Sequence, residues 1–284
     1  MELDNKYDEY LKEKNYYNFL MKVKTDLRKL IRKESYHEYS QTIIMALKTL
    51  TDIKEKESCM DLIKYYVDEF EKYLPKMKEK SIYLTTFNSI LETVAPLKYD
   101  LKLHISNFMR VADKNSITNE EMIRLKVHNA ITNFYQNCEN YSYAYKYSLL
   151  TLDPNLINQS LKNLFTRNKS ISTLEMYFFI TRAILELILR QKIEVAYELI
   201  KLNMDSDFQS NHPLINFGYF LVVLLDKYAS FDHFWLLINK YKASIDIDQN
   251  LIYYLNQISI TYFKKPIIEE QNNMLNNLMK LMSV

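Results

Sequence analysis

Apolar residues recur along this chain at the spacing of one face of a helix. Residues 57–74, ESCMDLIKYYVDEFEKYL, and residues 17–34, YNFLMKVKTDLRKLIRKE, show the pattern most clearly. The first stripe consists of Cys59, Leu62, Ile63, Tyr66, Val67, Phe70 and Leu74, and the second of Phe19, Leu20, Val23, Leu27, Leu30 and Ile31. Separations of three and four residues predict amphipathic helices, each with one buried face.

Short breaks interrupt the helical pattern, and we expect about a dozen helices between them. The breaks fall at 33–35, 74–76, 95–97, 113–116, 137–140, 153–155, 167–170, 205–213 and 245–248. Asp153 before Pro154, and Asp248 before the run QNLIYYL, are typical helix N-caps. Consecutive helix pairs of roughly 35–45 residues indicate an α-solenoid. We find no linker or shift in composition, so one tetratricopeptide-like solenoid of antiparallel helix pairs over residues 1–284 is expected.

Composition supports an all-α fold and excludes several functional classes. One glycine and five prolines leave little material for hairpins or phosphate-binding loops, which argues against a β-sandwich, a dinucleotide-binding fold or a P-loop. The net charge of +2 is not that of a nucleic-acid-binding domain. Two cysteines give no disulfide framework, and the five histidines form no HExxH or other metal motif. We therefore expect no enzyme activity, no cofactor and no metal.

The longest apolar run, Phe217–Leu225, is too short for a membrane span, which needs about 20 apolar residues. Asn216 precedes the run and Asp226 follows it, so a helix buried on most sides is expected. The run contains the only glycine, Gly218. Either a neighbouring helix approaches closely there or the glycine has no structural role. The charged start MELDNKYDEYLKEKN has no apolar core and predicts no signal peptide, so a cytosolic location is expected.

Two surfaces are candidates for binding. Lys24, Arg28 and Arg32 form a basic stripe at four-residue spacing, which is either a docking face for an acidic partner or a solvated helix face. In residues 267–284 an apolar stripe consists of Met274, Leu275, Leu278, Leu281 and Met282, with Asn272, Asn273, Asn276 and Asn277 opposite. This second stripe either caps the last hydrophobic face of the solenoid or binds a partner.

Several blocks of the chain resemble one family. The stretch HPLINFGYFLVVLL, followed by FDHFWLLINKYKASIDIDQNLIYYLNQISITYFKKP, is similar to the Golgi to ER traffic protein four family. The likeness rests there on Pro213-Leu214, Asn216-Phe217, Tyr241, Asp248, Tyr254-Leu255, Ile258, Tyr262-Phe263 and Pro266. Upstream blocks carry Arg182-Ala183-x-Leu185 with Ala196, then His128, Tyr135, Tyr141 and Ala144, and near the start YHEYSQ matches through Tyr36, Glu38 and Gln41.

The resemblance implies a non-enzymatic α-solenoid scaffold in the guided entry of tail-anchored proteins into the ER membrane. Such a scaffold does not itself insert into the membrane. Its N-terminal half, here about 1–140, would hold the pathway's dimeric targeting ATPase. Its C-terminal half, about 141–284, would hold the N-terminal segment of a ubiquitin-like partner. In animals a BAG-type chaperone subunit joins the same end.

The resemblance also implies two partner-binding faces. The ATPase face would include Lys24, Arg28, Arg32, Glu38, Gln41 and Lys48. The face for the ubiquitin-like partner would draw on Phe217, Phe220, Leu221, Tyr254, Ile258 and Tyr262, as core or groove residues. The chain departs from the family after Gln41, where arginines are usual, since TIIMALKTL carries only Lys48 as a charge.

Three other interpretations stay open. A generic helical-repeat adaptor of another complex would usually end in a winged-helix domain, but the last stretch shows no strand pattern. A peptide-binding regulator would often begin with a helix-turn-helix module, whereas the first 40 residues are expected to form one long helix. A helical enzyme would need a cluster of polar catalytic groups, which the sequence does not show.

Overall fold

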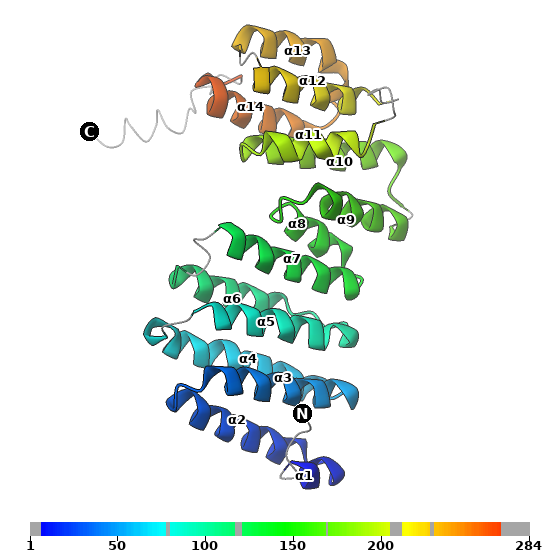
Figure 1. Ribbon diagram of the computed structural model, residues 1–284. Coiled ribbons are helices and arrows are strands. Elements are labelled where there is room, and N and C mark those ends of the chain that lie inside the picture. The colour runs from blue at the N-terminus through cyan, green and yellow to red at the C-terminus, as the bar shows by residue number, and fades with distance from the viewer. Residues whose placement is uncertain are drawn as a thin grey trace, which may run out of the picture. The chain divides into compact units, whose positions relative to one another are not determined.

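The computed structural model describes residues 7–77, 80–116, 121–168, 170–204, 212–227 and 230–267, and these residues form an all-α structure. They contain fourteen α-helices and two short 3-10 turns, and no strand occurs among them (Figure 1). The number of helices confirms the expected dozen or so. The chain divides into two compact units, Met1–Thr151 and Leu152–Val284.

Unit 1 contains the first eight helices. They are α1 (Asp8–Lys12), α2 (Tyr16–Arg32), α3 (Tyr36–Asp52), α4 (Lys56–Tyr73), α5 (Ser81–Val94), α6 (Lys102–Lys114), α7 (Glu121–Asn137) and α8 (Tyr141–Ser148). Helices α2, α4 and α6 contact one another in turn and form one layer, and α3, α5 and α7 form a second layer (Figure 1). This two-layer stack of successive helices is the predicted solenoid arrangement.

The core of unit 1 is built on aromatic rings. All seven apolar residues predicted for the stripe of α4 are buried, which confirms that prediction. Tyr66 and Phe70 of α4 contact Tyr83 of α5, and Phe87 of α5 stacks on Phe108 of α6 with ring centroids 3.5 Å apart. The hydroxyl of Tyr66 donates to the carbonyl oxygen of Tyr83 at 2.6 Å. Burial raises the pKa of both tyrosines well above its usual value, so both rings stay neutral.

Helix junctions in this chain turn sharply without glycine. After α2, the amide of Ser35 donates to the carbonyl of Leu30, and Glu34 between them has a left-handed φ of 59°. This is the Schellman arrangement, in which glycine is the usual residue. The same pattern ends α1, α3, α7 and α10, with Lys14, Lys54, Glu139 and Gln191 in the left-handed position. The next residue is in each case the N-cap of the following helix, so one residue reverses the chain.

The expectation of one long helix over the first 40 residues is wrong. The chain reverses at Lys14, whose φ is 54°, and the side chain of Asn15 accepts the amide of Asn18 to start α2. It reverses again at Glu34 before α3 begins. The second reversal agrees with the break expected at 33–35, whereas the turn at Lys14 was not predicted. Lysine is a strong helix former, so propensity does not show that turn, and the hydrogen bonds of the helix end decide it.

Unit 2 contains α9 (Pro154–Arg167), α10 (Thr173–Leu189), α11 (Ile193–Lys201), α12 (Pro213–Lys227), α13 (Phe231–Ile245) and α14 (Gln249–Phe263). Helix α10 packs against α9, α11, α12 and α14, so it lies at the centre of the unit. The side chain of Asp153 accepts two backbone amides at the start of α9, and Asp248 accepts one at the start of α14. Both predicted N-caps are therefore confirmed.

The apolar run at Phe217–Leu225 lies within α12, which is largely buried. Among the described helices, none has the length and apolar character needed to cross a membrane. A Cβ atom added to Gly218 would lie 3.4 Å from Cγ2 of Ile184 in α10 and 3.8 Å from Cδ1 of Ile200 in α11. These are ordinary van der Waals distances, so the neighbouring helices approach Gly218 but leave room for an alanine.

Candidate functional site

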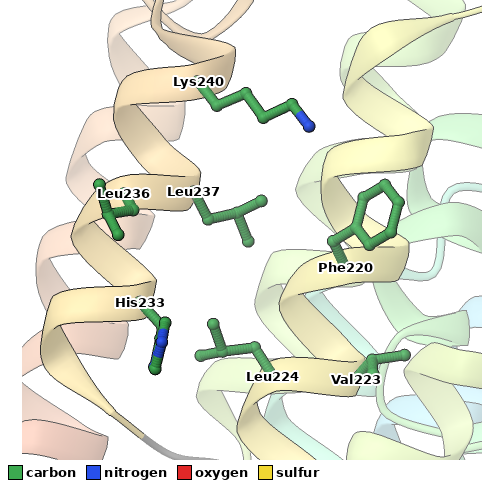
Figure 2. A pocket seen from close by; sticks show the side chains of 7 residues that line it. All are labelled: Phe220, Val223, Leu224, His233, Leu236, Leu237 and Lys240. Carbon is green, nitrogen blue, oxygen red and sulfur yellow. The ribbon is translucent and has the colours of Figure 1, made fainter.

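An open apolar groove lies between α12 and α13 in unit 2, and we call it the α12–α13 groove. Its volume is about 500 Å³, and it is lined by Phe220, Val223, Leu224, His233, Leu236, Leu237 and Lys240. Figure 2 shows Leu224 of α12 and Leu237 of α13 directed toward each other between the two helices, with Phe220 on the near face of α12. Phe220 is 47% exposed and Leu236 63% exposed. Large apolar side chains gathered in this way mark a binding groove more often than a solvated face.

The groove follows from an unusual run of apolar residues in α13. Positions 234–238 read FWLLI, and five consecutive apolar residues cannot all face one side of a helix. Phe234 and Ile238 point into the core and are buried, whereas Leu236 points outward. His233 and Lys240 stand one turn to either side of Leu236 and Leu237, so the α13 wall of the groove is apolar in its middle and polar at both ends.

The six residues predicted for the ubiquitin-like partner's face separate into three groups. Phe220 lines the α12–α13 groove. Phe217, Leu221 and Ile258 are buried in the core of unit 2. Tyr254 and Tyr262 are half-buried on α14, where they face α10 rather than the groove. The structure therefore places one predicted residue on the open surface and the others beneath or beside it.

The two tyrosines of α14 help to hold it against α10. The hydroxyl of Tyr262 donates to the carbonyl oxygen of Ile188 at 2.9 Å. Burial, and next the negative charge of Glu186, raises the pKa of Tyr254. Both interactions involve residues of α10, which indicates a structural role for the two rings.

An ion pair joins α10 and α14 at the other end of their contact. Nε and Nη2 of Arg182 lie 2.8 Å and 2.6 Å from Oδ2 of Asp248. The other carboxylate oxygen, Oδ1, accepts the backbone amide of Asn250 and so caps α14. Arg182 and Asp248 belong to separate blocks of the family resemblance, 66 residues apart, and the fold brings them into one contact.

Most residues that line the groove were not among the predicted site residues. Val223, Leu224, His233, Leu236, Leu237 and Lys240 were missed. The run FWLLI at 234–238 could have indicated the groove. If Phe234 points into the core, Leu236 lies on the opposite face of the helix and stays exposed unless another element covers it. The predicted residues came instead from the sequence blocks that resemble the family, and three of them, Phe217, Leu221 and Ile258, are buried in the core.

The basic stripe of α2 is partly used within unit 1. The ammonium of Lys24 lies 2.5 Å from a carboxylate oxygen of Asp61 in α4, and the guanidinium of Arg28 lies over the ring of Tyr65. Arg28 and Arg32 are exposed, whereas Lys24 is only partly so. Lys24 and Arg28 thus contact α4, and Arg32 is the stripe residue that is exposed and has no such contact with α4 among those described.

The other predicted ATPase-face residues lie on α3. Glu38, Gln41 and Lys48 are exposed and share the outward face of that helix. The side-chain amide of Gln41 lies 2.9 Å from Nε2 of His37. The six predicted residues therefore come from two neighbouring helices, three from α2 and three from α3, which pack against each other.

The histidine, cysteine and acidic side chains of the described residues do not gather into a metal-binding cluster. Within them, no group of three or more histidine, cysteine, aspartate or glutamate side chains is placed to hold a metal ion. His212 stacks on Tyr177 with ring centroids 4.1 Å apart, and its Nδ1 accepts the amide of Leu214 at the start of α12. Burial lowers the pKa of this imidazole, which favours the neutral form that the hydrogen bond requires.

Comparisons with known proteins agree with this architecture. A crystal structure of Get4 from C. therm. superposes with a TM-score of 0.75, covering 93% of this chain and 88% of that chain at 16% sequence identity, which establishes a common fold. A comparison with curated protein sequences gives no match. The family model described as Golgi to ER traffic protein 4 matches residues 33–283. This match spans most of the sequence, and the chain therefore belongs to the Golgi to ER traffic protein 4 family.

Proposed function

We propose that this chain is a scaffold in the targeting of tail-anchored membrane proteins to the ER, bridging the targeting ATPase and a ubiquitin-like partner. Family membership supports a role in this pathway. The observation that carries the bridging proposal is the α12–α13 groove, an open apolar surface in the C-terminal part of the chain, where we expect the ubiquitin-like partner to bind.

The α12–α13 groove would receive an apolar segment of the ubiquitin-like partner. Grooves between two helices commonly bind amphipathic segments, whose apolar side chains enter while their polar side chains remain in water. Leu236 and Phe220 supply exposed apolar area, and Lys240 and His233 stand at the ends of the α13 wall. This arrangement suits a partner segment with apolar anchors in its middle and acidic or polar groups toward its ends.

The ATPase would dock on unit 1, on the outward face of α3. Glu38, Gln41 and Lys48 lie together there and are exposed. The exposed guanidinium of Arg32 on α2 is a second cation that the ATPase could reach. Lys24 is directed toward Asp61 within unit 1 and is less available. Exposed charges of this kind chiefly set association rate and orientation, so ATPase binding should weaken as salt concentration rises.

Calorimetric titration of the full chain with the N-terminal segment of the ubiquitin-like partner tests the groove. Leu236→Asp should weaken binding by about 2 kcal/mol or more, roughly 30-fold in affinity, because it places a charge in the centre of the apolar surface. Ile247→Asp is a matched control, since Ile247 is 61% exposed in the same unit but does not line the groove. Equal binding by both variants would overturn the proposed docking site.

A second titration, with the ATPase, tests the other half of the bridge. Lys48→Glu should weaken ATPase binding and leave binding of the ubiquitin-like segment unchanged, because the two surfaces belong to different units. Leu236→Asp should show the reverse. A variant of either surface that abolished both interactions without loss of helical structure would contradict two independent docking sites.

A further inference from the structure

A second groove lies on the opposite side of α13, between α13 and α14, and we call it the α13–α14 groove. Its volume is about 260 Å³. Its apolar wall consists of Trp235, Ile238, Ile245, Ile252, Leu255 and Ile267. Trp235 is 42% exposed, an unusual state for so large an apolar ring unless another element covers it.

The course of the chain after α14 leads into this groove. Helix α14 ends at Lys264, which has a left-handed φ of 57° and reverses the chain direction. The hydroxyl of Ser259 then donates to the carbonyl oxygen of Lys265 at 2.6 Å, and the amide of Ile267 donates to the side chain of Asn256 at 2.8 Å. The chain therefore runs back along α14 toward its first turns, and Ile267 forms part of the groove wall.

We propose that residues 268–284 form an amphipathic helix that docks in the α13–α14 groove. Their apolar stripe, Met274, Leu275, Leu278, Leu281 and Met282, has the spacing of one helix face. The asparagines at 272, 273, 276 and 277 lie on the other side of that helix and would remain in water. These residues lie outside the described part of the structure. The groove, the path of residues 264–267 and the amino-acid sequence support their docking at this place.

The dimensions of the segment and the groove agree. An apolar stripe from residue 274 to residue 282 extends about 12 Å along a helix, at about 1.5 Å per residue. The α13 wall of the groove, from Trp235 to Asp246, extends about 16 Å on the same basis. Residues 268–273 connect Ile267 to the stripe and can span up to about 20 Å when extended. The segment can therefore reach any part of the groove from the position where Ile267 leaves it.

The charges at the groove are also compatible with this occupant. Lys242 and Asp246 of α13 line the groove and supply one charge of each sign. The segment carries both signs as well, with Glu269 and Glu270 before the stripe and Lys280 within it. Methionines at both ends of the stripe suit an irregular apolar surface, because their unbranched side chains adapt to it.

Docking of this segment would separate the two sides of α13. The segment would cover Trp235 on one side and leave Leu236 in the α12–α13 groove available to a partner on the other. The segment would then cover the apolar surface between α13 and α14, the last two described helices. The end repeats of solenoids need such a cover. This inference is independent of the proposed partners, since it concerns only contacts within the chain.

Trp235 makes the proposal testable, because it is the only tryptophan in the sequence and lines the groove. The full chain is compared with the double variant Leu275→Asp/Leu278→Asp by tryptophan emission and acrylamide quenching. We expect the double variant to show a red shift and a larger quenching constant, because its apolar stripe no longer covers the indole. The matched control is Asn272→Asp/Asn276→Asp, which adds the same charge on the opposite face and should behave as the unmodified chain.

Two results would overturn the proposal. One is equal emission and quenching for the unmodified chain and both double variants. The other comes from oxidative cross-linking of a cysteine that replaces Leu278, in the middle of the apolar stripe, with a cysteine on α13. If Lys240→Cys, in the α12–α13 groove, cross-links more efficiently than Asn239→Cys, in the α13–α14 groove, the segment occupies the other side of α13. Burial raises the pKa of Cys59 and Cys138 to about 11, so the native thiols react slowly.

Discussion

The two units of this chain use different long-range connections. In unit 1 the principal contacts join each helix to the next one or the one after it, as in α2 with α3 and α4. In unit 2 the last described helix, α14, returns to α10 and pairs Asp248 with Arg182. Unit 1 is therefore a simple repeat stack, whereas unit 2 is closed by a contact between distant parts of its sequence.

The units also differ in what their interfaces are made of. The centre of unit 1 is an aromatic cluster in which Phe87 and Phe108 stack and Tyr66 joins two helices through its hydroxyl. The α10–α14 contact in unit 2 depends instead on one carboxylate that serves both as N-cap and as ion-pair partner. A repeat stack distributes its stability over many neighbour contacts, while a closing contact concentrates it in a few residues.

Phe108→Ala should cause the largest loss of stability, and the loss should be concentrated in the helices that contact Phe108. Removal of this fully buried ring leaves a cavity between α4, α5 and α6, and a loss of about 3–5 kcal/mol in the free energy of unfolding is expected. Chemical denaturation measures the loss, and amide hydrogen exchange locates it. Protection should fall most in α4–α6 and least in α2, and a uniform loss across unit 1 would contradict the picture of a neighbour-only stack.

Asp248→Ala tests the closing contact of unit 2. We expect a loss of about 2–4 kcal/mol, because the substitution removes an N-cap and leaves the partly buried guanidinium of Arg182 without its carboxylate. Amide exchange should increase around residue 182, 66 positions away, as well as in the first turn of α14. A loss confined to α14 would show that the ion pair does not hold the two helices together.

Asp248→Asn is the control for that substitution. Asparagine caps helices about as well as aspartate, so this variant keeps the cap of α14 and loses only the charge. Its loss of stability should be smaller than that of Asp248→Ala. Equal losses in the two variants would mean that the cap contributes little and that the ion pair accounts for the effect.

Gly218→Ala should have the smallest effect and the opposite sign. Alanine is a better helix residue than glycine by about 1 kcal/mol, and its Cβ would meet Ile184 and Ile200 at ordinary distances. Thermal unfolding should therefore show a modest stabilisation. A destabilisation would mean that α10 and α11 pack against Gly218 too closely for any side chain, and would favour the interpretation that the glycine marks a required close approach.

Features that depend on a few neighbouring residues could be predicted from the sequence. The buried stripe of α4, the N-caps at Asp153 and Asp248 and most helix breaks were predicted correctly. Each depends on periodicity or on hydrogen bonds within one turn, and these are local properties of the chain. The family blocks could be found for a related reason, because core positions keep their order along the sequence.

Which apolar residues stay exposed could not be predicted from the sequence, because exposure depends on how the helices pack. Phe217 and Phe220 lie three residues apart on α12, yet one is buried and the other lines the α12–α13 groove. The difference arises because α10 and α11 cover part of α12 while the groove leaves another part open. Likewise, no local pattern pairs Arg182 with Asp248. Exposure and pairing depend on which helix lies opposite, and that is a property of the assembled fold rather than of any one segment.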